Sequence, residues 1–244
     1  MKYYVFILMS LLLVCCYNKP ETQEQKVNIV QEFKRTNKLC ISIEYKQPVN
    51  GYTVKVICSP YDSYDKERDT EIWGKALLCF EKDNRCFYIN NDSYSDSVLF
   101  YVNKTPIKDG MVLCLDYLPK RADEYLSENS PFFFHDIDFD GKEELIINNW
   151  REGIRYCNTY DVYKVDESGF RQITDPPFYK ISNYATEFDP INQTITLNDL
   201  IEAGVYLQHI YKRFLHKEID SLSNKVDSCY KFELVKTSHK VFYQ

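Results

Sequence analysis

The sequence predicts a mainly β fold: an antiparallel sandwich, barrel or propeller-like meander, with one short helix near its N-terminus. Short runs of β-branched and aromatic residues recur along the chain, and clusters of turn residues separate them at fairly regular intervals. Such spacing favours an antiparallel sandwich or barrel over alternating strand and helix units. Because no repeat of fixed period is clear, the sequence does not predict a complete propeller.

The first residues, MKYYVFILMSLLLVCC, have the pattern of an export signal. The apolar run from Val5 to Val14 is interrupted only by Ser10. It is shorter than the roughly 20 apolar residues that a membrane-spanning helix needs. We therefore expect residues 1–15 to be a signal peptide. The alternatives are an uncleaved anchor and a secretory signal without lipid.

The end of this segment, Leu13-Val14-Cys15-Cys16, resembles the lipobox of bacterial lipoproteins. In that motif an aliphatic residue at −3 and a small residue at −1 precede the lipidated cysteine. Cys16 is the better acceptor because Leu13 then stands at −3, and Cys15 is the alternative. The resemblance implies several acyl chains, palmitate among them, and two or more chains hold a protein firmly on a membrane. It places the mature protein in the cell envelope, at the outer membrane of a Gram-negative bacterium, with the membrane face left open.

Charge excludes one class of partner. Lys2 is the one charged residue among residues 1–15, so their removal changes the net charge from −6 to −7. A protein of that sign lacks the electrostatic attraction that drives nucleic-acid binding. We expect no nucleic-acid partner, and no polybasic stretch suggests binding to acidic lipid heads.

The mature chain begins with a polar segment. Residues 17–26, YNKPETQEQK, are expected to be a tether between the lipid and the folded part. Val27, Val30 and Phe33 then recur at helical spacing, which predicts a short amphipathic helix that ends by Asn37. We expect the lipidated cysteine, tether and helix at residues 16–38 and a single mainly β domain at residues 39–244.

The rest of the chain reads as a series of strands. We expect them at residues 40–46, 52–58, 73–80, 85–90, 97–103, 111–117, 144–149, 159–164, 193–197, 204–214, 229–236 and 240–243. The stretch from Leu200 to His216 satisfies both a strand and a helix period. We favour a strand there because Gly204 and the neighbouring turns suit a meander.

Seven cysteines follow Cys16, an odd number that leaves at least one thiol unpaired within the chain. Export permits disulfides, although buried cysteines also act as small apolar residues. Cys79 and Cys86 flank a turn and are the local candidate pair. A turn at Asp83-Asn84 would place them diagonally, about 7–8 Å apart and too far to bridge. A turn centred on residues 82–83 would place them directly opposite.

One motif carries chemistry. Carboxylates stand at positions 1, 3, 5 and 9 of a short loop, as Asp136, Asp138, Asp140 and Glu144, with Gly141 at position 6. Calcium takes about six to eight oxygen ligands, and alternate side chains of a tightly turning loop can direct carboxylates to one point. Glycine permits the sharp bend. The sequence therefore predicts a structural Ca²⁺ site.

The carbonyl of Lys142 would supply the oxygen at position 7. Position 12 of the pattern is Ile147, within an expected strand, so the loop is not an EF-hand. The alternative is a solvated turn, since Asp and Gly are turn residues. Four carboxylates within nine residues repel one another unless a cation joins them, which favours the metal.

The stretch FFFHDIDFDGKEELII resembles the D-x-D-x-D-G-x-x-[DE]-L calcium loops of FG-GAP and VCBS-type β repeats. It also resembles exported β proteins of the lysozyme-inhibitor kind, whose later features would correspond to residues 160–163 and 188–195. The resemblance covers roughly residues 130 to 235, and its one copy departs from the multiple copies of FG-GAP arrays.

No local motif indicates an enzyme, and Trp150 is the candidate for a ligand-facing ring. We expect a non-enzymatic binding or structural lipoprotein whose calcium-stiffened β domain engages an envelope protein or glycan. The alternatives are an inhibitor of a cell-wall lytic enzyme and an envelope glycan hydrolase.

Overall fold

The computed structural model describes most of the chain. The described residues are 23–61, 72–96, 107–121, 124–127, 130–149, 158–202, 205–219 and 226–241. The expectations for the signal peptide, Cys16, the strand at 97–103 and Trp150 lie outside these ranges. The described residues form two sheets and one helix with no closed barrel, which confirms a mainly β fold of the sandwich kind.

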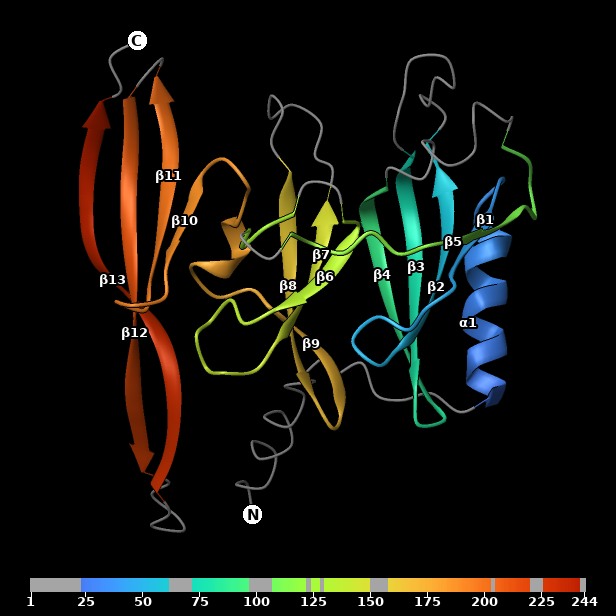
Figure 1. Ribbon diagram of the computed structural model, residues 1–244, viewed down its shortest axis with the longest axis horizontal. Helices are drawn as coiled ribbons and strands as arrows, with labels where there is room; N and C mark the ends of the chain where they lie inside the picture. The colour runs from blue at the N-terminus through green and yellow to red at the C-terminus, as the bar shows by residue number, and fades with distance from the viewer. Residues whose placement is uncertain are drawn as a thin grey trace, which may run out of the picture.

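The elements follow the order drawn in Figure 1. They are α1 (Gln23–Thr36), β1 (Ile41–Tyr45), β2 (Thr53–Pro60), β3 (Ile72–Lys82), β4 (Arg85–Asp96), β5 (Val112–Leu115), β6 (Phe132–His135), β7 (Glu144–Asn149), β8 (Thr159–Asp166), β9 (Gly169–Ile173), η1 (Phe178–Lys180), β10 (Thr186–Asp189), β11 (Thr194–Glu202), β12 (Val205–Ile219) and β13 (Val226–Val241).

The first sheet has the strand order β5-β1-β2-β3-β4-β7-β8-β9, with β6 paired to β7. Its pairs are antiparallel except β1 with β5, which is parallel and departs from the antiparallel expectation. A parallel pair needs a long connection, and the chain from β1 to β5 supplies one because it first builds β2, β3 and β4. The second sheet, β10-β11-β12-β13, is an antiparallel meander.

The main core lies between the two halves of the first sheet. One face of β1–β5 packs on one face of β6–β9, and aromatic rings join them. The ring of Phe80 on β3 lies 5.3 Å from that of Phe132 on β6 and 5.0 Å from that of Phe170 on β9, between centroids. Edge-to-face aromatic pairs add to the free energy gained from apolar burial.

The second sheet packs on the other face of β6–β8. Phe133 and Ile146 point to this side and meet Ile195, Leu197 and Tyr211. Because β7 separates two cores, all six of its residues are buried, which suits its apolar run Leu145-Ile146-Ile147. The expectation of a strand at 144–149 is confirmed.

The helix α1 covers the outer face of the β1–β4 half, where Ile29, Val30 and Phe33 pack over Ile57 and Leu77. The predicted helix is confirmed, but it starts at Gln23. The last four residues of the predicted tether are therefore helical.

The described residues between Leu200 and His216 are strand, as favoured: β11 extends to Glu202 and β12 runs from Val205 to Ile219. The strand expected at 229–236 and the described part of the strand expected at 240–243 belong to one strand, β13, and a bulge near Leu234 keeps it paired with β12. The sequence analysis missed β6, β9 and β10. β6 is too short for its run of Phe residues to show a period, and β9 and β10 carry polar residues.

The β3–β4 hairpin turns at Asp83 and Asn84, which have φ values of +51° and +60°. Lys82 and Arg85, on either side of this turn, form the last pair of the ladder. Cys79 therefore lies opposite Tyr88 and diagonal to Cys86. The expectation that this arrangement holds the cysteines too far apart is wrong, because their Sγ atoms are 2.6 Å apart. The right-handed twist of a two-stranded hairpin shortens one of its two diagonals.

Candidate functional site

The acidic loop, residues 136–144, connects β6 to β7. Ile137 is fully buried in the second core and anchors the loop. The chain turns at Phe139, with φ +62°, and at Gly141, with φ +84°. The bend at Gly141 was predicted, and open space surrounds the position that its Cβ would take. Phe139 was not predicted, and its ring packs against the same core.

The loop folds around its own carboxylates. Asp136 accepts backbone N–H groups of Asp140 and Gly141, each at 3.0 Å. Asp138 also accepts from Asp140, at 3.1 Å. Glu144, at the start of β7, accepts the N–H of Ile137 at 3.1 Å. These bonds satisfy donors that a tight turn leaves without a backbone acceptor.

Three of the predicted ligands converge. One oxygen each from Asp136, Asp138 and Glu144 lies within 4.8 Å of the others. Asp138 is 8% exposed and Glu144 only 1% exposed. Asp140 is linked to Asp138 and Glu144 through Lys164, which contacts all three carboxylates. The backbone N–H of Lys142 donates to Asp140 at 2.8 Å. The loop thus gathers carboxylates in a half-buried place where their repulsion is poorly screened.

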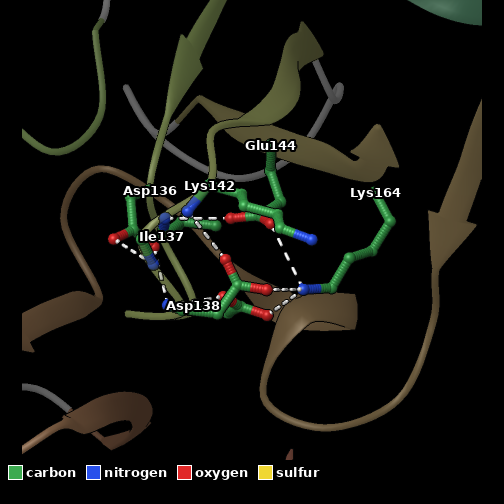
Figure 2. Close-up of polar contacts among 8 residues, drawn as sticks. Asp136, Ile137, Asp138, Lys142, Glu144 and Lys164 are labelled. Carbon is green, nitrogen blue, oxygen red and sulfur yellow. Dashed lines mark hydrogen bonds and ion pairs between the residues drawn. The ribbon is translucent and has the colours of Figure 1, made fainter. Parts of the chain in front are cut away.

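A lysine from the neighbouring strand lies among these carboxylates. Lys164 on β8 places its Nζ 2.8 Å from Asp140 and 3.4 Å from Glu144, and it also bonds Asp138 (Figure 2). The β7–β8 ladder pairs Leu145 with Tyr163, so Glu144 and Lys164 stand at the next step of the register. Opposite charges at facing positions of a ladder stabilise the pair.

The sequence analysis missed Lys164. It is 20 positions beyond Glu144, and only the register of two strands brings the two side chains together. The alternation of residues 159–164 predicted the strand but gave no partner for its last residue.

Burial and charge shift the proton affinities of this cluster. Burial, reinforced by the nearby Asp138 carboxylate, raises the pKa of Glu144 to about 7 despite the opposing effect of Lys164. Burial also raises the pKa of Asp138, although Lys164 acts against it. Burial alone would lower the pKa of Lys164, but Asp138 and Asp140 outweigh it and raise that pKa. Lys164 therefore stays charged, and Glu144 titrates near neutral pH.

The donor chemistry of the loop fits a hard divalent cation. Its carboxylates converge, and each carboxylate oxygen that accepts one N–H retains a second lone pair. Lys164 already supplies a positive charge at the same place, so a calcium ion would have to displace its ammonium group. One ammonium balances only part of the charge of four carboxylates, which leaves the loop net negative whether or not Glu144 is protonated.

A second feature is an exposed apolar area on the β12–β13 hairpin. We call Leu215, Tyr230 and Leu234 the hairpin surface; each is about half exposed. Leu215 lies opposite Tyr230 in the ladder, and the guanidinium of Arg213 lies 3.5 Å from the centroid of the Tyr230 ring. Figure 1 shows β12 and β13 running side by side past the ends of β10 and β11, on the side of the molecule away from α1.

Comparisons with known proteins give little. No protein-family model and no curated protein matches the chain. One solved structure, described as a Xanthomonas type IV secretion system related protein, is similar at 13% identity with a TM-score of 0.47. The match covers 83% of this chain and 93% of that one. At this level of similarity the match carries no argument about function.

Proposed function

We propose that this chain is a non-enzymatic binding module of the bacterial cell envelope and that the hairpin surface binds a partner protein. The observation that carries the proposal is the half-exposed group Leu215, Tyr230 and Leu234 on two long paired strands. Aliphatic and aromatic side chains exposed together favour association, because covering them releases ordered water and lowers the free energy. Aliphatic members favour a protein over a glycan, which stacks mainly on aromatic rings.

A photo-crosslinking residue tests this surface. Placed at position 230 of the full chain in a bacterium that makes the protein natively, it is expected to give a discrete adduct of defined mass. The substitution Leu215→Ser in the same chain is expected to weaken that adduct severalfold, because it removes apolar contact area. The readout is immunoblotting followed by mass spectrometry.

The matched control places the crosslinker at Ile191, which is 91% exposed in the turn between β10 and β11 of the same sheet. An identical adduct from position 191, or none from position 230, would contradict the proposal.

Attachment to the membrane is the second part of the proposal. It is supported by the lipobox-like residues 13–16. Among the described residues, no helix is both long and apolar enough to span a bilayer. A lipid on Cys16 would hold the protein at the membrane through the residues before α1.

We expect cells fed an alkyne analogue of palmitate to label the chain and expect Cys16→Ser to remove the label, since Cys16 is the acceptor that the lipobox-like residues favour over Cys15. Cys15→Ser is the control and should retain it. Undiminished labelling of Cys16→Ser would remove the anchor from the proposal.

A calcium ion at the acidic loop is the third part. The converging oxygens of Asp136, Asp138 and Glu144 support it. Because Lys164 competes for the same carboxylates, the ion would bind in exchange with the ammonium group and would stiffen the loop rather than take part in chemistry. No specific observation favours the hydrolase or the lytic-enzyme inhibitor over the binding module.

A further inference from the structure

The β3–β4 hairpin carries a pair of cysteines that the binding function does not use. Cys79 and Cys86 are 8% and 3% exposed, and their side chains point to the same face of the hairpin. Their Sγ atoms lie 2.6 Å apart, closer than two unbonded sulfur atoms rest.

The surroundings keep the two sulfurs together. Tyr88 lies directly opposite Cys79 in the ladder, and Ile57 and Leu77 pack beside the pair. The turn at Asp83-Asn84 fixes the register, because both residues adopt the left-handed conformation that tight two-residue hairpins require.

We infer that Cys79 and Cys86 form a disulfide that closes the β3–β4 hairpin. The oxidant is a disulfide of the exported compartment, carried by a protein or a small thiol compound. One cysteine thiolate attacks the oxidant's disulfide, and the first thiol of the oxidant leaves. The second cysteine thiolate then attacks the mixed disulfide, and the second thiol leaves with the pair of electrons. Two cysteine thiols are oxidised, and one external disulfide is reduced to two thiols that take up the two protons.

An approach route exists for such an oxidant. A groove between α1 and β2–β4 is lined by Val30 and Lys34 on the helix and by Cys79, Cys86 and Tyr88 on the strands. The bond would fix the surface on which α1 docks, because Ile29, Val30 and Phe33 pack over this cluster.

Other cysteines are placed differently. Cys58 points into the main core on the opposite face of the same half-sheet. Cys114 is exposed on β5, and Cys229 lies on β13 of the second sheet. Cys40 packs in the same cluster as the pair and is the one described thiol that can compete with it.

Peptide mapping tests the bond directly. The full mature chain is refolded from its reduced, denatured state in a glutathione redox buffer, alkylated in denaturant and digested with trypsin. Cleavage after Lys82 and Arg85 puts the two cysteines on separate peptides, 76–82 and 86–104. We expect these peptides to remain joined until a reductant is added and expect Cys114→Ser to leave the link unchanged.

Two results would overturn the inference. One is quantitative alkylation of both Cys79 and Cys86 before reduction, and the other is a link from either of them to Cys40. A second readout is thermal: the chain closed by the bond is expected to melt about 5 °C above Cys79→Ala/Cys86→Ala, since the ring closed by the bond is short. These readouts do not depend on the hairpin surface, so failure of partner binding and failure of the disulfide are distinguishable.

Discussion

Substitution of Lys164 by methionine is expected to lower the free energy of unfolding by about 3 kcal/mol at pH 8 in calcium-free buffer. Methionine is unbranched and one atom shorter than lysine, so it keeps most of the apolar side chain and removes the charge. Asp138 and Glu144, both buried, would then lack the ammonium group that Lys164 presents to them. An unpaired buried carboxylate costs more than the original ion pair contributes. Urea denaturation at fixed pH measures the change.

The loss should shrink at pH 5, because Glu144 and then Asp138 can take up protons when the lysine is absent. Lys55→Met is the matched control. Lys55 pairs with Glu44 at 2.6 Å, but both side chains are over 40% exposed, so its removal should cost less than about 1 kcal/mol. Lys164→Met with the stability of the unchanged protein would show that the acidic loop needs no internal cation.

Calcium titration of the unchanged protein and of Lys164→Met tests the proposed metal site. If the ion occupies the loop in exchange with Lys164, calorimetric titration should give heat with the unchanged protein and a tighter affinity with Lys164→Met. Calcium should then recover much of the lost stability in a concentration-dependent way. Asp138→Ala should abolish the heat. If neither the unchanged protein nor Lys164→Met gave heat or a shift of melting temperature with calcium, the calcium proposal would be refuted.

Glu144 is expected to make the protein more stable at pH 5 than at pH 8. Its folded-state pKa of about 7 lies above the ordinary value of 4.5, so the folded chain holds a proton that the unfolded chain has released. The free energy of unfolding therefore falls as the pH rises from about 4.5 to 7 and is level above that range. A shift of this size corresponds to about 3 kcal/mol.

The difference between the unchanged protein and Glu144→Gln isolates this effect. Glutamine keeps an oxygen that can accept the N–H of Ile137 and does not titrate. Between pH 5 and pH 8, the free energy of unfolding of Glu144→Gln should rise by about 2.5 kcal/mol relative to that of the unchanged protein. His135 acts in the opposite direction, because burial lowers its pKa, but it is common to both proteins and cancels in the difference.

Glu143→Gln is the control, since Glu143 is the exposed neighbour in the chain. Its stability profile should run parallel to that of the unchanged protein. Parallel profiles for Glu144→Gln as well would refute a titrating carboxylate at this position.

Local pattern predicted most of the strands. The run Glu144–Asn149 matched β7 to the residue, because a short apolar run bounded by turn residues suits a strand buried on both faces. The spacing of Val30 and Phe33 predicted α1, whose apolar face lies on the sheet. The spacing of apolar residues did not distinguish a strand from a helix between Leu200 and His216. The described residues there are strand, because β12 has a partner strand on each side that satisfies its backbone hydrogen bonds.

The sequence by itself determined the acidic loop. Its carboxylates are close in the chain, so alternation and Gly141 were enough to predict that Asp136, Asp138 and Glu144 converge. Only the tertiary structure decided what lies among them. Lys164 reaches the loop through the register of β7 and β8, and the twist of β3–β4 brings Cys79 to Cys86. Both contacts depend on how strands pair and twist, which a single sequence does not encode in any local pattern.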